Sequence, residues 1–280
     1  MDFDASLGIY LSAKLLGKKG IILYDVLDTY ADRYVGASYI SGVLRYLESK
    51  VFSFSDYGIH VDSFRVNTLY SENVNTYIIH NKPRFDDLVP IENKAKNDCF
   101  TILISGGVYE HRGVLKIITA VNDLIQQGYN LKVDVIGFGD ESVVENLNRH
   151  RFVTFHGYVS SLEAQKFSLN SDLIGCLYDP ESPINRMASP NKVFDAVANA
   201  TLALVNQEVN SGTKSSEALN VVECEYNSSD SIKAAIMNAM HKMGDCHFRS
   251  SLIQRANDFR NGELWDSEFA CLTDKLQSNS

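Results

Sequence analysis

Apolar and polar residues alternate along the second half of the chain in blocks that predict a strand and then a helix, repeated several times. Between residues 98 and 245, short apolar runs are each followed by a segment with apolar residues three or four positions apart. Such runs are typical of strands buried on both faces of a parallel sheet, and such spacing is typical of amphipathic helices. The predicted strands are 100–105, 131–137, 152–157, 172–178 and 201–207, and the predicted helices are 112–127, 141–150, 161–171 and 190–200. Because parallel strands need crossover helices, the pattern predicts a doubly wound α/β domain.

The first part of the chain shows fewer strands. The predicted elements are a helix at 5–16, a strand at 21–28, a helix at 37–54 and strands at 57–62 and 75–80. Three strands are too few for a self-sufficient Rossmann-like domain of about 150 residues. A chain that starts on a crossover helix also lacks the strand from which that helix returns. We therefore expect residues 1–90 to be the latter part of a larger domain.

A linker and further helices complete the predicted elements. The polar segment 81–97 contains two of the five prolines and predicts a linker. Additional helices are predicted at about 214–220, 230–243 and 248–278.

Composition narrows the classes of protein that fit. The chain is 45% hydrophobic and 22% charged, as in ordinary globular proteins. Its net charge of −9 argues against a nucleic-acid partner, because phosphate neutralisation needs a basic face. The five cysteines are scattered without a C-x-x-C pair or Cys/His cluster, so neither a zinc site nor a disulfide framework is expected. An acidic start and the lack of an apolar run of about 20 residues predict a cytosolic protein.

Two glycines and an arginine follow the predicted strand 100–105, at the end of the sheet where open α/β domains bind ligands. Gly106 and Gly107 allow the backbone to approach a ligand closely, and N–H groups at the start of the next helix attract phosphate. Arg112 is placed to add a charge-assisted hydrogen bond to a diphosphate. The alternative is a tight strand-to-helix turn with a solvated arginine.

A second helix start reads Ser189-Pro190-Asn191-Lys192 and is followed by Asp195. Ser189 is a natural N-cap and Pro190 a natural first helical residue. The positive end of this helix is expected to face the same cleft as the glycine pair. Lys192 suits a phosphate oxygen, and Asp195, on the same helical face, suits two neighbouring hydroxyls. The alternative is an ordinary capped helix with an ion pair between these two residues.

A third candidate lies at the end of the predicted strand 152–157. Gly157 and Tyr158 offer backbone groups and a ring to a nucleobase, the alternative being a turn glycine beside a packed tyrosine. The sequence contains no Gly-x-Ser-x-Gly, no P-loop pattern and no metal-binding cluster. The segment 137–139 has two glycines but lacks the third glycine of a dinucleotide-binding fingerprint.

Taken in order, these motifs resemble the C-terminal domain of retaining GT-B glycosyltransferases, in particular glycosyltransferase family 4. The segments that carry the resemblance are 106–107, 112–113, 135–139, 155–159, 171–175 and 189–196. The last one looks like the donor-binding helix of the family. Trp265 resembles the tryptophan that opens the final helix of the family, which crosses back onto the N-terminal domain. In the first part, 24–28 looks like the strand that ends at the cleft, and 79–83 like the exit into the linker.

The resemblance implies an α/β fold of GT-B type, with a complete C-terminal Rossmann-like domain and a partial N-terminal one. The C-terminal domain would have a parallel sheet with helices on both faces. The implied boundaries are a partial acceptor-side domain and linker at 1–95, a nucleotide-sugar-binding domain at 96–250 and a helix crossing back at 251–280.

The implied activity is transfer of a sugar from a nucleotide-diphosphate sugar to an acceptor hydroxyl, with retention and without a metal or other cofactor. Arg112 and Lys192 would be catalytic by stabilising the leaving diphosphate. The residues implied to bind the substrate are Gly106, Gly107, Gly157, Tyr158, Ser189, Pro190, Asn191 and Asp195. The implied setting is surface polysaccharide biosynthesis on a lipid-linked saccharide acceptor, in the cytoplasm and in peripheral contact with the inner face of the plasma membrane.

Departures from the family pattern support a second hypothesis. The family has glutamate at the positions of Asp195 and Met187, commonly arginine at Gly107 and histidine at Leu27. With the short N-terminal part, these differences favour a non-catalytic or truncated nucleotide-binding remnant. A nucleotide-sugar 2-epimerase, which shares the fold, is a further alternative, and it would release free sugar and nucleotide without an acceptor.

Overall fold

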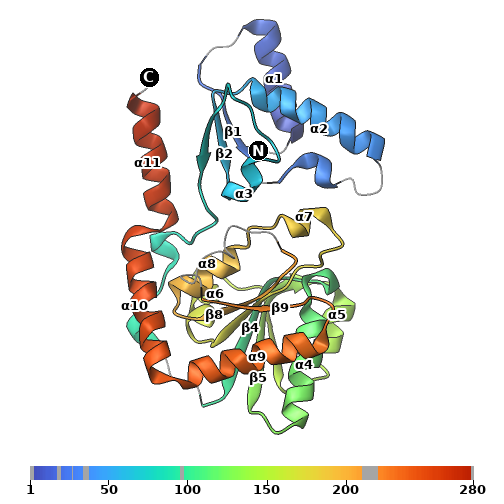
Figure 1. Cartoon of the computed structure of the whole chain (residues 1–280), viewed down its shortest axis with the longest axis vertical. Coiled ribbons are helices and arrows are strands. Elements are labelled where there is room, and N and C mark those ends of the chain that lie inside the picture. The colour runs from blue at the N-terminus through green and yellow to red at the C-terminus, as the bar shows by residue number, and fades with distance from the viewer. Residues whose placement is uncertain are drawn as a thin grey trace.

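The chain forms two parallel β-sheets, one in each half, joined by an extended linker and by the last helix (Figure 1). The computed structural model describes residues 3–17, 20–26, 28–33, 38–94, 98–209 and 220–278. Leu27 and residues 214–219 of a predicted helix lie outside these described ranges.

The N-terminal half contains a three-stranded sheet of order β1-β2-β3, and its strands are β1 (Leu23–Val26), β2 (Tyr57–His60) and β3 (Asn75–Ile78). Its helices are α1 (Phe3–Leu16), α2 (Ser38–Ser53) and the short α3 (Ser63–Val66). Large side chains of α1 and α2 pack on the sheet, among them Phe3 and Phe52. The sequence pattern did not predict α3, because four residues are too few to show helical periodicity. This helix begins at Asp62, whose carboxylate accepts a hydrogen bond from the backbone N–H of Phe64 at 2.9 Å.

His60, at the carboxyl end of β2, makes the stability of this half depend on pH. Its ring is fully buried, with its centroid 5.7 Å from that of Phe52. Burial lowers the pKa of His60 to about 4, and the nearby charge of Arg65 acts in the same direction. Between pH 6.5 and 4 the unfolded chain therefore binds a proton at His60 that the folded protein does not bind. The free energy of unfolding consequently decreases as the pH is lowered. When the pH is lowered from 7 to 5, the free energy of unfolding should fall in both the wild type and His60→Gln. We expect the fall to be about 2 kcal/mol smaller in His60→Gln, as measured by urea denaturation. Equal losses in the two proteins would contradict the pKa assignment.

The C-terminal half contains a six-stranded parallel sheet of order β6-β5-β4-β7-β8-β9. Its strands are β4 (Phe100–Val108), β5 (Leu131–Gly139), β6 (Val153–Gly157), β7 (Leu173–Cys176), β8 (Leu202–Asn206) and β9 (Val221–Cys224). The first five match the predicted strands, whereas β9, with only four residues, was not predicted. The strand order reverses between β4 and β7, and ligands of open α/β sheets bind at such a switch point.

Helices cover both faces of this sheet, as predicted (Figure 1). Those on one face are α4 (Val114–Gln126), α5 (Glu141–Leu147) and α9 (Ser229–Gly244), and those on the other are α6 (Ser161–Leu169) and α8 (Asn191–Ala198). The short α7 (Pro183–Arg186) lies between β7 and α8, and single 3-10 turns occupy 30–33, 85–87, 91–93 and 110–112. The predicted helix 248–278 is two helices, α10 (Cys246–Gly262) and α11 (Trp265–Ser278), because Glu263 leaves the helical conformation with φ −122° and ψ 12°.

The last helix returns to the N-terminal half, where α11 runs beside the three-stranded sheet (Figure 1). Leu272 of α11 is buried together with Ile59 and Ile79. Glu268, one helical turn before Leu272, accepts hydrogen bonds from the backbone N–H and Nδ1 of His80, at 2.7 and 2.8 Å, and from Lys82 Nζ at 2.7 Å. Burial alone would raise the pKa of Glu268, but these hydrogen bonds hold it below its usual range. The carboxylate thus fixes the exit of β3 against α11.

The other end of the linker is anchored by Lys94. Its ammonium group donates hydrogen bonds to the carbonyl oxygens of Leu169, Ser171 and Asn199, and to Thr201 Oγ1, at 2.8 to 3.2 Å. Burial lowers the pKa of Lys94 to about 8. These acceptors lie at or just after the ends of α6 and α8, where the negative ends of helix dipoles favour a cation. The linker is therefore fixed at both ends.

Candidate functional site

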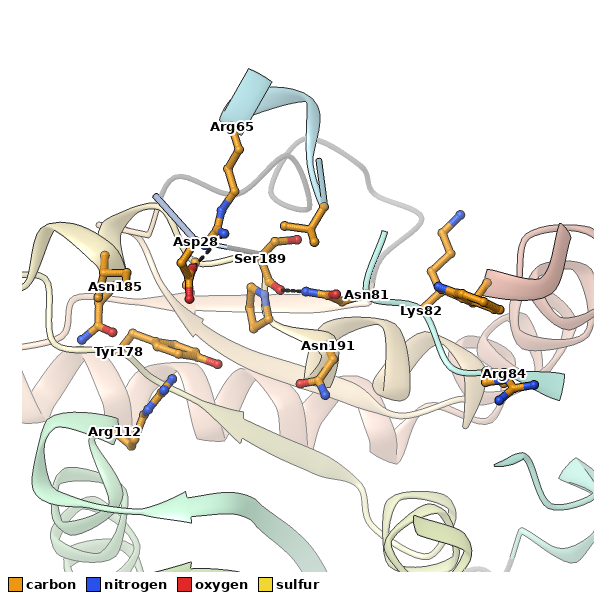
Figure 2. A pocket seen from close by; sticks show the side chains of 15 residues that line it. Asp28, Arg65, Asn81, Lys82, Arg84, Arg112, Tyr178, Asn185, Ser189 and Asn191 are labelled. Carbon is orange, nitrogen blue, oxygen red and sulfur yellow. Dashed lines mark hydrogen bonds and ion pairs between the residues drawn. The ribbon is translucent and has the colours of Figure 1, made fainter. Parts of the chain in front are cut away.

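A cleft of about 610 Å³ lies between the two halves (Figure 2). Five of the residues that line it follow the carboxyl ends of strands. In the smaller sheet Asp28 follows β1, Val61 follows β2 and Asn81 follows β3, and in the larger sheet Arg112 follows β4 and Tyr178 follows β7. The loops after β4 and β7 flank the switch point of the larger sheet. The cleft is therefore placed where an open α/β domain binds its ligand.

Arg112 lies at the floor of this cleft, with its guanidinium over the ring of Tyr178, 4.3 Å from the ring centroid. Burial raises the pKa of the Tyr178 hydroxyl above its usual range, so this ring stays neutral. The three other cations of the cleft each have a carboxylate partner, and the pairs are Arg65–Asp28 at 2.9 Å, Lys82–Glu268 at 2.7 Å and Arg84–Asp266 at 3.8 Å. In the described part of the chain, no carboxylate lies within ion-pair distance of Arg112. Its charge is thus available to an anionic ligand.

The start of α8 forms the opposite wall, through Ser189, Pro190 and Asn191. The prediction that Ser189 caps this helix is wrong: Pro190, with φ −74° and ψ 122°, is the capping residue, and Asn191 is the first helical residue. No side chain caps the helix. The Ser189 hydroxyl is instead buried, and it has no hydrogen-bond partner among the described residues. A buried hydroxyl in that state is costly unless a ligand supplies its partner.

Lys192 and Asp195 form the ion pair that their spacing allowed, with Nζ 3.3 Å from Oδ2. Asp195 is 7% exposed, and its other oxygen accepts a hydrogen bond from Gln165 Nε2 at 2.9 Å. Both residues line a smaller cavity of about 220 Å³. This cavity shares Asn81, Lys82, Arg84 and Asn191 with the main cleft. The two spaces therefore adjoin, with the start of α8 between them.

Gly106 and Gly107 form neither a loop nor a turn after the strand, because β4 continues through both to Val108. Gly106 pairs in register with Gly137 of β5, and a Cβ on Gly137 would lie 1.9 Å from the Gly106 carbonyl oxygen. These glycines allow two strands to approach closely. A Cβ on Gly106 would lie 3.9 Å from Lys192 Cε, so the end of β4 does adjoin α8. Neither Gly106 nor Gly107 lines the cleft.

Gly157 ends β6 and Tyr158 follows it, and neither residue lines either cavity, although Ser161, three residues later, lines the smaller one. Gly157 has φ +69°, and the Tyr158 side chain is 81% exposed. This placement matches the turn-glycine alternative, although the tyrosine is exposed rather than packed. A contact between these residues and a nucleobase stays a prediction.

Several residues of the cleft were not among the predicted site residues, although the resemblance placed the end of 24–28 at the cleft (Figure 2). They come from the N-terminal half, the linker and the start of α11: Asp28, Arg65, Asn81, Lys82, Arg84 and Trp265. Asp28 and Asn81 follow predicted strands, so the rule that sites form at carboxyl ends of strands was the signal that could have found them. Arg65 lies on α3, whose four residues carry no such signal.

Comparisons with known proteins support the fold assignment. No protein-family model matches the chain, and no curated protein matches its sequence. Sucrose-phosphate synthase from Thermosynechococcus elongatus matches with a TM-score of 0.73 and 11% identity, over 97% of this chain and 72% of that one. Anabaena Alr3699/HepE in complex with UDP matches with a TM-score of 0.75 and 11% identity, over 98% and 76%. WaaG, a glycosyltransferase involved in lipopolysaccharide biosynthesis, gives 0.63 and 12%, over 94% and 79%.

At such low identity these similarities show the fold alone, which is the GT-B fold of glycosyltransferases. The expected α/β class of GT-B type is therefore confirmed. In the described part of the chain, no helix combines the length and apolar character needed to cross a membrane.

Proposed function

We propose that the protein transfers a sugar from a nucleotide-diphosphate sugar to an acceptor hydroxyl, with retention of configuration. One observation carries the proposal: Arg112, without a carboxylate partner in the described chain, faces the start of α8 across the switch-point cleft. A guanidinium and a helix N-terminus converging on one space are a site for a diphosphate. The GT-B neighbours include a protein whose structure contains UDP-glucose.

The proposed chemistry is departure of the nucleoside diphosphate from the sugar. Negative charge grows on the leaving phosphate, so fixed positive groups lower the barrier. Arg112 would stabilise one side of the diphosphate. Lys192 and the first N–H groups of α8 would stabilise the other side, and the Ser189 hydroxyl would find there the partner that it lacks among the described residues.

The nucleoside is proposed to occupy the smaller cavity. Asp195 lines that space and would accept hydrogen bonds from the ribose hydroxyls, while Asn191 spans it and the main cleft. Because Lys192 already pairs with Asp195, one lysine would orient the ribose-binding carboxylate and face the diphosphate. Gly157 and Tyr158 remain the proposed contacts of the base.

The proposed setting is surface polysaccharide biosynthesis. The similarity to WaaG, which is involved in lipopolysaccharide biosynthesis, supports this part of the proposal. The acceptor would be a lipid-linked saccharide, and the protein would act in the cytoplasm, in peripheral contact with the inner face of the plasma membrane. No cofactor and no nucleic acid take part in the proposed reaction.

A thermal-shift screen against UDP, GDP, ADP, CDP and dTDP tests the proposal. At a concentration 100 times its dissociation constant, a ligand specific to the folded protein stabilises it by about 2.7 kcal/mol. For a protein of this size we expect one of these nucleotides to raise the melting temperature by about 5 °C. A flat response to all five would reject nucleotide-sugar chemistry. If the protein binds a nucleotide sugar and releases free sugar without an acceptor, the result would indicate a nucleotide-sugar 2-epimerase. If it binds a nucleotide sugar without converting it, the result would indicate a non-catalytic remnant.

A further inference from the structure

Two side chains outside the C-terminal half bind the backbone that leads into α8, and Figure 2 shows one of these bonds, from Asn81 to Ser189. Arg65 Nε, on α3, donates a hydrogen bond to the Met187 carbonyl oxygen at 2.6 Å. Asn81 Nδ2, after β3, donates one to the Ser189 carbonyl oxygen at 3.1 Å. The two bonds lie on either side of Ala188, so the segment 187–189 is held at both ends from across the cleft.

Within the C-terminal half this segment has little support of its own. No side chain caps α7, which precedes it, or α8, which follows it. The Ala188 N–H donates to the carbonyl oxygen of Asn185, in the last turn of α7, at 3.1 Å, a bond that stays within the local segment. An uncapped helix start is free to fray or shift. The bonds from Arg65 and Asn81 are therefore well placed to fix it.

Arg65 is built to hold its position. Its side chain is 9% exposed, and Nη1 forms an ion pair with Asp28 at 2.9 Å. Asp62 caps the start of its helix α3, so the base of the side chain is fixed as well. A planar guanidinium that binds a carboxylate and a carbonyl oxygen at once sets both distance and angle, which a lysine does not.

We propose that Arg65 and Asn81, which lie across the cleft from α8, are positioning residues for the site that binds the nucleotide-sugar donor. By holding 187–189 they set where the Ser189 hydroxyl and the first N–H groups of α8 lie. The binding of a nucleoside diphosphate by these groups rests on the proposed function. The positioning of the segment 187–189 does not depend on it. Donor binding then depends on contact between the two halves.

Hydrogen exchange and calorimetry on the full chain test the proposal with the variants Arg65→Met, Arg65→Lys and Asn81→Ala. The matched control is Arg45→Met, which removes an arginine–aspartate pair of the same half, Arg45 with Asp32 at 2.7 Å, on α2. In Arg65→Met and Asn81→Ala we expect amide exchange across 187–193 to be about tenfold faster. We expect about tenfold weaker binding of whichever of the five nucleoside diphosphates the wild type binds best.

Arg65→Lys should recover part of both effects, because a lysine reaches one of the two partners but not both. If Arg65 had only a structural role, its substitutions would change the free energy of unfolding without this graded change in nucleotide affinity. The proposal would be overturned if Arg65→Met and Asn81→Ala showed the same amide exchange rates across 187–193 and the same nucleotide affinity as Arg45→Met. If Arg65→Met does not fold, Arg65→Lys and Asn81→Ala carry the same comparison.

Failure of the proposed function has a different signature. If the wild type binds none of the five nucleotides, the proposed function fails, and the exchange comparison still decides whether Arg65 and Asn81 position the segment. If the wild type binds a nucleotide and the variants match it in both measurements, only the positioning proposal fails.

Discussion

Arg112→Ala should weaken nucleoside diphosphate binding by about 10- to 100-fold, the effect of losing a charge-assisted hydrogen bond. Arg112 has no carboxylate partner in the described chain, so the unliganded protein loses only its stacking on Tyr178. The melting temperature without ligand should therefore change little. Isothermal titration calorimetry with the nucleotide selected by the thermal-shift screen measures the affinity.

Lys116→Ala is the matched control for this experiment. Its ammonium lies 4.7 Å from the centroid of the Tyr226 ring, a cation–π contact in the same half of the molecule but outside the cleft. The control should bind nucleotide as the wild type does. Equal affinity in the wild type, Arg112→Ala and Lys116→Ala would remove Arg112 from the site.

Gly137→Ala should lower the free energy of unfolding by about 3 kcal/mol or more, because strain in φ and a steric clash add together. Gly137 has φ +128°, and its Cβ would lie 1.9 Å from the Gly106 carbonyl oxygen. Relief requires β4 and β5 to separate where the end of β4 adjoins Lys192. Urea denaturation followed by circular dichroism measures the loss.

Gly128→Ala separates these two causes. Gly128 also has a positive φ, +94°, but nothing lies within 4 Å of its Cβ position. Backbone strain alone should cost about 1 to 2 kcal/mol there. Similar losses in the two variants would show that the close approach of β4 and β5 is not what requires glycine at position 137.

The C-terminal fold was predictable because its signals are long and repeated. Each of β4 to β8 is a run of apolar residues followed by a helical pattern, and the crossover rule then fixes a parallel sheet. The short β9 and α3 have too few residues for any period to appear. The break at Glu263 directly follows Asn261 and Gly262, a dipeptide typical of turns, and this signal was overlooked within the helical pattern of 248–278.

The candidate site was predictable in outline, through the two segments that carry Arg112 and Lys192. Local sequence signals failed where tertiary contacts compete with them. The glycine pair was expected to follow the end of the strand, but pairing of β4 with β5 extends the strand through it. Ser189 is a strong capping residue by type, yet the helix begins after Pro190. Arg65 and Asn81 enter the site from the other half of the molecule, and no local pattern shows that contact.

A crystal structure with the selected nucleoside diphosphate soaked into the cleft is the most direct experiment. Both phosphate groups should lie beside the switch between β4 and β7, one within hydrogen-bond distance of the Arg112 guanidinium and the other against the first backbone N–H groups of α8. A nucleotide bound elsewhere on the molecule, with Arg112 and the start of α8 both left in contact with solvent, would contradict a shared diphosphate site.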